Sequence, residues 1–179
     1  MAMQFRWLLT AAAAAAAQAA QLAYAAEYMS VDAAQRQAFP AATAFEPVVV
    51  SAEVKLAVAS EHGRFFVDPR IWRVREGERT AGWFIVDEVI GKVELITYAL
   101  ALDAQGAVRS LDILAYRESH GDAIRLATWR AQFTGKTAAD PVKLDDDIRN
   151  VSGATLSCRH VTDGVHRLLA LYRRALARG

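Results

Sequence analysis

The most regular pattern of apolar and polar positions lies near the C-terminus. From about Ala154 onward, apolar side chains recur every three or four residues, as they do on one face of an α-helix. These positions are Cys158, Val161, Val165, Leu168, Leu169, Tyr172 and Leu176. Arg173, Arg174 and Arg178 fall in the last turns, where cations interact favourably with the helix dipole. The pattern predicts a long C-terminal helix that buries one face.

The middle of the chain has the composition of β-strands. Short runs rich in β-branched and aromatic residues are separated there by Pro and Gly. The predicted strands are 64–67, 71–75, 82–89, 93–103 and 108–116. Ala104-Gln105-Gly106 joins the last two strands as a hairpin turn. The block therefore predicts a meandering antiparallel sheet.

Two helices are predicted before this block. Ser30 is placed to cap a helix over residues 31–39, which ends at Pro40. A second helix is predicted over residues 46–59 and ends near Gly63.

One more helix is predicted after the strands. Asp122 is placed to cap a helix over residues 123–133, which Gly135 ends. One face of this helix carries Leu126, Trp129, Arg130 and Phe133. Residues 134–150 are predicted to form a loop. Helices, then a sheet, then helices predict a single α+β domain, with an antiparallel sheet flanked by helices.

Residues 1–26 have the features of a secretory signal peptide. The segment contains one base, Arg6, and no acid, and an apolar stretch with seven alanines from Ala11 to Ala17 follows. It ends in Ala23-Tyr24-Ala25, a small-residue cleavage motif. The alternative is an uncleaved leader that acts as a membrane anchor, since the segment is just long enough to span a bilayer. The sequence predicts export to the periplasm, with residues 27–179 as the functional domain.

Composition and charge exclude several classes of protein. The 179 residues carry 21 Lys and Arg against 20 Asp and Glu, and the part after residue 26 carries 20 of each. A nucleic-acid-binding protein would show a basic excess or patch, so that class is excluded. The only cysteine, Cys158, excludes an intrachain disulfide and a Cys-based metal cluster. We expect Cys158 to be a small buried residue of the C-terminal helix.

Residues 147–157 bring small and hydroxyl-bearing side chains to the start of the predicted C-terminal helix. The free backbone amides and the dipole at a helix N-terminus bind anions such as phosphate. Gly153 and Ala154 leave room for a second molecule near the backbone, and Thr155 presents a hydroxyl group there. The alternative interpretation is that Ser152 simply caps the helix.

The run Ser152-Gly153-Ala154-Thr155 resembles the flavinylation motif of FMN-binding domains. Such domains occur within the sodium-translocating NADH:quinone reductase, within the related electron-transport complex and as small exported proteins. The resemblance implies that Thr155 is esterified to the phosphate of FMN. It also implies that an FAD:protein FMN transferase makes this bond outside the cytoplasm, which agrees with the predicted leader.

A second segment is similar to the same family and lies upstream in the expected order. The family pattern Glu-x-x-Gly, then Gln-Phe-x-Gly-Lys, is matched by Glu118 to Gly121 and, after Trp129, by Gln132 to Lys136. The stretch from Gly82 to Lys92 is similar to the exported members of the family. The resemblance covers roughly residues 80–170.

The chain departs from the family at one position. The family often has an acid three residues before the motif serine, and this chain has Arg149 there. Asp147 lies two residues earlier and Asn150 one residue later. The acid is thought to help the transferase, and Asp147 would replace it only if the loop is flexible. The departure therefore bears on covalent attachment more than on flavin binding.

The resemblance implies roles for the other candidate residues. Those expected around the phosphate or beside the cofactor are Ser152, Gly153, Ala154, Leu156, Glu118, Ser119, His120 and Gly121. Trp129 and Phe133 are candidates to pack against the isoalloxazine ring, or they form the core face of their helix. Lys136 would bind phosphate or a ring carbonyl, or it is a solvated surface lysine. His160 and His166 are six residues apart and do not share a helix face, so no metal site is predicted.

These observations predict an exported flavoprotein that carries FMN on Thr155 and relays electrons, rather than an enzyme with its own substrate. The expected partners are the FMN transferase and a membrane redox protein. The alternative is an exported module that binds FMN or another phosphorylated ligand without a covalent bond. A small reductase of a soluble substrate is less favoured, because no second nucleotide-binding site is recognisable.

Overall fold

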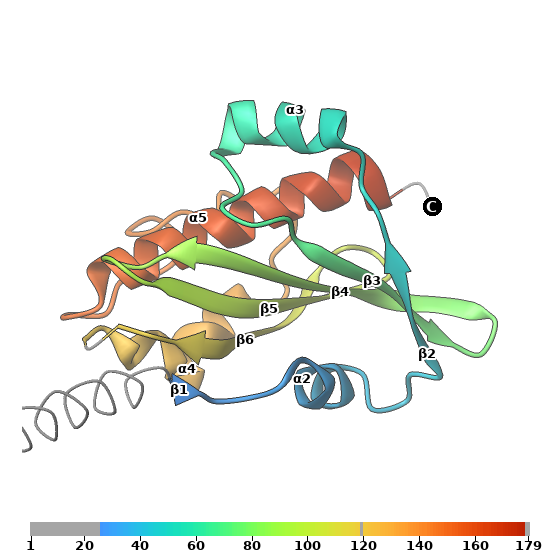
Figure 1. The fold of residues 1–179 in the computed structure, drawn as a ribbon, viewed down its shortest axis with the longest axis horizontal. Helices are drawn as coiled ribbons and strands as arrows, with labels where there is room; N and C mark the ends of the chain where they lie inside the picture. The colour runs from blue at the N-terminus through green and yellow to red at the C-terminus, as the bar shows by residue number, and fades with distance from the viewer. Residues whose placement is uncertain (1–25, 119, 178–179) are drawn as a thin grey trace, which may run out of the picture.

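A six-stranded antiparallel sheet forms the middle layer of the protein (Figure 1). The structure, a computed structural model, describes residues 26–118 and 120–177. The strands lie in the order β1-β6-β5-β4-β3-β2, so β2 to β6 form a meander and β1 adds to its β6 end. The bounds of the strands are β1 Ala26–Glu27, β2 Ala44–Val48, β3 Arg70–Glu76, β4 Arg79–Ile90, β5 Leu95–Asp103 and β6 Val108–Tyr116.

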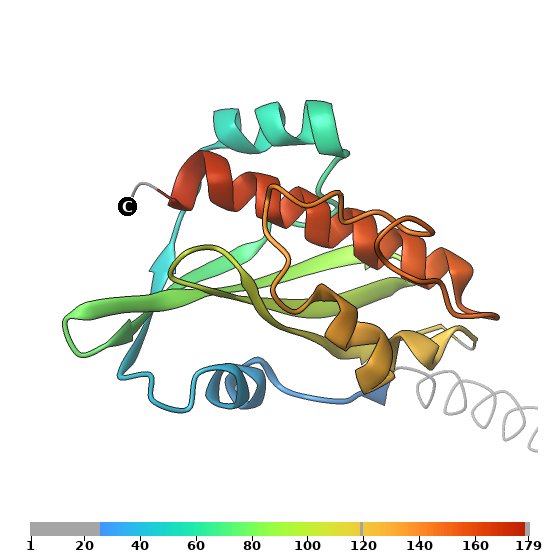
Figure 2. The same cartoon turned by 180° about the vertical axis from the view of Figure 1, so that it is seen from behind.

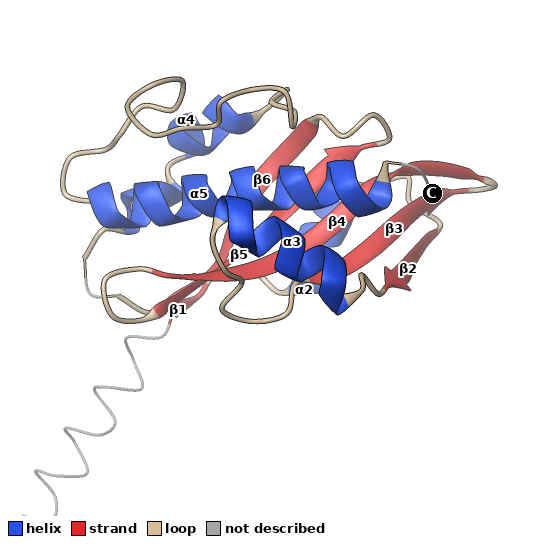
Figure 3. Ribbon diagram, turned by 90° about the horizontal axis from the view of Figure 1, so that it is seen from above, coloured by secondary structure: helices blue, strands red, loops and turns tan. Residues whose placement is uncertain are grey.

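Helices cover both faces of this sheet (Figure 1, Figure 2). Helix α5 (Thr155–Leu171) lies along one face and α2 (Val31–Ala38) against the other, while α3 (Ala52–His62) packs on the outer side of α5 (Figure 3). The short helices beside β6 and the π-helical turn that extends α5 are η1 Asp122–Arg125, α4 Ala127–Arg130, η2 Ala131–Phe133 and η3 Tyr172–Leu176.

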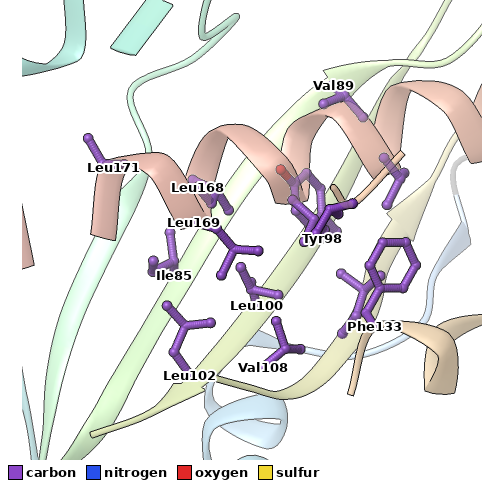
Figure 4. Packing of buried hydrophobic residues seen from close by; sticks show 14 of the residues in the cluster. Ile85, Val89, Tyr98, Leu100, Leu102, Val108, Phe133, Leu168, Leu169 and Leu171 are labelled. Atoms are coloured by element: carbon purple, nitrogen blue, oxygen red, sulfur yellow. The ribbon is translucent and has the colours of Figure 1, made fainter. Parts of the chain in front are cut away.

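Two apolar cores lie on the two faces of the sheet. The larger one joins α5 to β4, β5 and β6, with Leu100 of β5 and Leu168 and Leu169 of α5 among its members (Figure 4). The smaller one lies beneath α2, where Phe39 belongs to the same cluster as Phe84 of β4. Because both faces of the central strands are covered, β4 and β5 are apolar along most of their length instead of alternating.

A buried polar network fixes α5 on the sheet. The Nη2 atom of Arg167 donates to Oδ2 of Asp87 at 2.9 Å, and the Tyr98 hydroxyl donates to the same oxygen at 2.8 Å. Burial raises the pKa of Asp87, although Arg167 beside it acts in the opposite direction. Gly164 gives Tyr98 room to approach α5, since a Cβ atom there would lie 2.4 Å from the Tyr98 hydroxyl.

The prediction of a single α+β domain with a long C-terminal helix is confirmed. The predicted strand 108–116 has the same bounds as β6, and the meandering order of the strands is as expected. The Ser30 side chain accepts a hydrogen bond from the amide of Ala33 and caps α2 as predicted. Cys158 is a free, buried residue of α5.

Before β3, the second predicted helix exists as α3 and ends near Gly63 as expected, but its predicted start is wrong, and so is the predicted strand 64–67. Residues 46–48 belong to edge strand β2 and not to a helix, and α3 begins only at Ala52, where Ser51 caps it. Pro47 is tolerated in β2 because an edge strand needs hydrogen bonds on one side only. The predicted strand 64–67 is a loop, and β3 starts at Arg70.

The predicted helix 123–133 is interrupted. Leu126 has an extended backbone, with φ −56° and ψ 125°, which ends η1 before α4 begins. Asp122 lies inside η1 and does not cap it. Arg130, expected on the apolar face, forms an ion pair with the buried Asp112 of β6 and also donates to the carbonyl of Leu111. These contacts hold the short helix α4 against β6.

The predicted leader, residues 1–26, lies outside the described residues except for Ala26. Among residues 26–118 and 120–177, no helix combines the length and the apolar character needed to cross a membrane.

Candidate functional site

The N-terminus of α5 has unoccupied backbone amides. Thr155 is the first helical residue, and no side chain among the described residues caps the helix. The Ser152 hydroxyl therefore does not cap α5, and that alternative is wrong. The amides of Thr155, Leu156 and Ser157 have no acceptor within the described part of the chain. Such amides, with the positive end of the helix dipole, form a site for an anion.

The Thr155 side chain is exposed at this end of the helix. Its Oγ1 atom accepts a hydrogen bond from Nδ2 of Asn150 at 3.0 Å. Ser152 and Leu156 are also exposed, and apart from its two chain neighbours no described residue comes within 4 Å of where a Cβ atom of Gly153 would stand. Ala154 is buried and anchors the turn to the core. The four-residue motif thus leaves open space around an accessible hydroxyl group.

The segment from Glu118 to Gly121, which resembles the family, lies close to the start of α5. The Tyr116 hydroxyl donates to the carbonyl of His120 and lies 3.0 Å from Oγ of Ser157. Since the single Tyr116 proton is used for that carbonyl, Ser157 is the donor to Tyr116. Gly121 lies so close that a Cβ atom there would be 2.7 Å from the Tyr116 oxygen. Ser119 lies outside the described residues.

Glu118 organises the turn between β4 and β5. Its Oε1 atom accepts hydrogen bonds from the amides of Val93 at 2.6 Å and Glu94 at 2.9 Å, and from the amide of Lys92. Burial acts to raise the pKa of Glu118, but these three amides outweigh it and the pKa is lowered. The carboxylate is therefore held charged, and it joins this turn to the loop that leads to Gly121.

A cavity of about 460 Å³ lies beside the motif. It is lined by the side chains of Leu126, Thr128, Trp129, Gln132, Lys136, Asp147, Arg149, Asn150 and Val151. Lys136 pairs with Asp147 at 2.8 Å, and this hydrogen bond raises the pKa of Lys136. Lys136 is therefore held in an ion pair and is not a freely solvated surface lysine. The pair lines the same cavity as Asn150.

Asp147 is fully engaged in its own loop. Besides Lys136, it accepts from the amide of Lys143 at 2.7 Å and from that of Val142 at 3.2 Å. Burial acts to raise the pKa of Asp147, but the hydrogen bonds prevail and lower it. In this arrangement the Asp147 carboxylate is engaged by three hydrogen bonds, and Arg149 occupies the sequence position of the family's acid.

Trp129 and Phe133 take the core role that the sequence left open. Both rings are buried and contact each other edge to face, with centroids 5.1 Å apart. Trp129 Nε1 donates to the carbonyl of Arg149 at 2.9 Å, so only part of this residue borders the cavity. Trp129, packed on Phe133, thus forms part of the cavity wall.

The sequence did not predict that the Gln132 side chain binds the backbone of Arg149, a contact that we call the Gln132 clamp. Its Oε1 atom accepts from the amide of Arg149 at 2.8 Å, and its Nε2 atom lies 3.4 Å from the Arg149 carbonyl oxygen. The family pattern was visible at Gln132, but a contact from a side chain to a backbone 17 residues away leaves no spacing signal. The clamp fixes the chain immediately before Asn150.

A second cavity, of about 420 Å³, lies between α3 and α5 and is lined in part by His62, His160 and His166. The rings of His62 and His166 are 4.8 Å apart. Within the described residues, no group of three or more His, Cys, Asp or Glu side chains is arranged to hold a metal ion.

The described site fits the phosphate of FMN. It offers free amides, an accessible hydroxyl group and open space at one helix end, and the cations of Lys136 and Arg149 line the adjoining cavity. The model of the FMN-binding domain family matches residues 91–170, a range that includes every one of these residues. A search among curated proteins found no match. Residues 91–170 therefore match the FMN-binding domain family, and the cofactor that this domain indicates is FMN.

Proposed function

We propose that this protein is an exported flavoprotein that carries FMN as a phosphoester on Thr155 and relays electrons in an extracytoplasmic, membrane-associated redox chain. The observation that carries the proposal is the uncapped start of α5 in the matched domain. There an exposed Thr155 hydroxyl lies next to amides that have no acceptor among the described residues. A phosphate esterified to Thr155 would supply oxygen acceptors for these amides.

The attachment step requires FAD and the transferase. The bond between Thr155 Oγ1 and the FMN phosphorus forms, the bond from that phosphorus to the AMP oxygen breaks, and the hydroxyl proton is released as AMP leaves. No oxidation or reduction is involved. Covalent attachment suits an exported protein, which has no access to the FMN pool of the cytoplasm.

Bound FMN supplies one- and two-electron transfer chemistry, and the chain supplies retention and electrostatics. The free amides of the first turn of α5 would hold the phosphate. The cavity of about 460 Å³ has the size of a small-molecule site, and Arg149 brings a positive charge to it, whereas the charge of Lys136 is balanced by Asp147. This arrangement supports a carrier of electrons whose partner would be a membrane redox protein.

The test is the intact mass of the protein after co-expression with the FMN transferase in an exporting host. We expect one added FMN less one water on the unaltered chain and no addition on Thr155→Ala. Thr134→Ala, which removes an exposed threonine outside the motif, is the matched control and should be labelled normally. If Thr155→Ala is labelled as well, the attachment residue is wrong. The N-terminal residue of the same sample tells whether the leader was removed.

The engagement of Asp147 and the presence of Arg149 favour a second candidate function, an exported module that binds FMN without a covalent bond. In that case, the unaltered protein would carry no added mass after co-expression, although the transferase is active. Titration with FMN, followed by quenching of flavin fluorescence, would then give similar affinities for the unaltered protein and for Thr155→Ala. A Thr155→Ala protein that binds no FMN would exclude this candidate.

A further inference from the structure

The geometry around Thr155 points to Asn150 as a positioning residue for flavin attachment: its amide group donates a hydrogen bond to the nucleophilic oxygen and holds this oxygen in one orientation. This inference rests on the proposed phosphoester at Thr155. It adds a residue that the family pattern does not supply, since the family's acid would stand at position 149.

The orientation of the Asn150 amide group is fixed by its own neighbour. The backbone amide of Val151 donates to Oδ1 of Asn150 at 2.7 Å. Only the oxygen of a side-chain amide accepts, so Nδ2 must be the atom that faces Thr155, at 3.0 Å from Oγ1. Because an NH₂ group only donates, Thr155 Oγ1 is the acceptor in this contact. One lone pair of Oγ1 is engaged, while the other lone pair and the proton remain available.

The backbone that carries Asn150 is held on its N-terminal side. Gln132 accepts from the amide of Arg149, and the indole of Trp129 donates to the Arg149 carbonyl. Two residues earlier, Asp147 closes the loop with its contacts to Lys136 and Lys143. The backbone at Asn150 is therefore held in place by its neighbours. The Thr155 side chain, in contrast, is exposed and has no other hydrogen bond among the described residues. Without Asn150, the hydroxyl would sample several rotamers.

The contact also suits the product of the reaction. When Oγ1 bonds to phosphorus and the AMP oxygen leaves, Oγ1 loses its proton but keeps a lone pair. The Nδ2–H group of Asn150 therefore has an acceptor both before and after the step. A side-chain amide does not take up the released proton at ordinary pH, so Asn150 positions the nucleophile and is not its base.

The test is the rate of labelling in vitro by purified transferase and FAD, followed by intact mass. Asn150→Ala should be labelled about tenfold more slowly, the effect of one lost hydrogen bond. Its thermal midpoint should change little, because the Val151 amide that loses its acceptor is not fully buried and can bond to water. A merely structural role predicts instead that slower labelling accompanies a loss of folded protein. Gln105→Ala, an exposed amide in the β5–β6 hairpin turn, is the control and should react at the normal rate.

Asn150→Asp separates positioning from base catalysis. The carboxylate still accepts from Val151, so the turn is kept, but it cannot donate to Oγ1 and its charge opposes the incoming pyrophosphate. We therefore expect slower labelling. Faster labelling would mean that attachment does not need the hydrogen bond donated to Oγ1, which overturns the inference. Equal rates for Asn150→Ala and the unaltered protein also overturn it. No labelling of the unaltered protein, when the transferase labels another acceptor domain, would overturn the proposed function and this inference with it.

Discussion

Replacement of Gly121 by alanine tests whether the contact between the two family segments holds the site together. Gly121 has φ +92°, in the left-handed region that residues with a Cβ atom seldom adopt. That conformation costs about 1–2 kcal/mol for alanine. The added Cβ atom would also lie 2.7 Å from the Tyr116 oxygen and 3.0 Å from Oγ of Ser157, so these groups must move.

The contribution of the contact follows from the hydrogen bonds at risk. Tyr116 donates to the His120 carbonyl and accepts from Ser157, and each such bond contributes about 1 kcal/mol net. Gly121→Ala should therefore lower the free energy of unfolding by about 3–4 kcal/mol in total. Gly135→Ala is the matched control, since Gly135 has φ +82° and nothing within 4 Å of its Cβ position. This variant should lose only the backbone part, about 1–2 kcal/mol.

The assay is urea unfolding of the two variants and the unaltered protein, followed by tryptophan fluorescence and circular dichroism. The midpoint of Gly121→Ala should fall clearly below that of Gly135→Ala, with the same slope. In thermal unfolding, the difference of about 2 kcal/mol corresponds to roughly 4–8 °C. Equal losses in the two variants would refute the reasoning, because the packing of Gly121 against Tyr116 and Ser157 would then contribute nothing.

Three other substitutions follow from the structure. Gly164→Ala should destabilise the protein by about 1–3 kcal/mol in urea unfolding, although alanine favours helices, because its Cβ atom would meet the buried Tyr98 hydroxyl. Glu118→Gln should lower the free energy of unfolding by about 1 kcal/mol at pH 7. Because the pKa of Glu118 is lowered in the folded protein, this difference from the unaltered protein should shrink as the pH falls below 4.5, the ordinary value, and vanish below the lowered pKa. Burial and the neighbouring His62 lower the pKa of His166, so the unfolded chain takes up this proton first and stability falls as the pH drops below 6.5. Thermal melts of His166→Gln at pH 7.5 and 5.5 should show a smaller fall than those of the unaltered protein.

The parts of the fold that the sequence predicted well are those with a strong local signal. The hairpin turn and the β-branched run gave β6 its bounds, and the 3.6-residue period gave α5. Strand β2 was missed because its pairing with β3 is a long-range contact, and the same residues also fit a helical pattern. The interruption at Leu126 was missed for a related reason, since contacts of Arg130 with β6 decide where α4 lies.

The candidate site divides in the same way. The family resemblance implied that Glu118 to Gly121 lie beside the cofactor, and in the structure the contact of Tyr116 with Ser157 joins this segment to the start of α5. The role of Asn150 was not visible, because nothing in the sequence tells that its amide group reaches Thr155 rather than solvent. The sequence also left open whether Asp147 would replace the family's acid, and it gave no sign that the Asp147 carboxylate makes three hydrogen bonds within the structure.

The missing cap of α5 has a consequence for how the protein can combine stability with binding. A side-chain cap contributes about 1 kcal/mol, and α2 and α3 both use one. Burial of a large apolar side chain contributes about 1.5–3 kcal/mol, and α5 buries several, including Val161, Val165 and Leu168. Helix α5 therefore depends on its packing against the sheet and tolerates an open N-terminus. Its first amides can then be left without acceptors in residues 26–118 and 120–177, which is the condition that a phosphate on Thr155 would require.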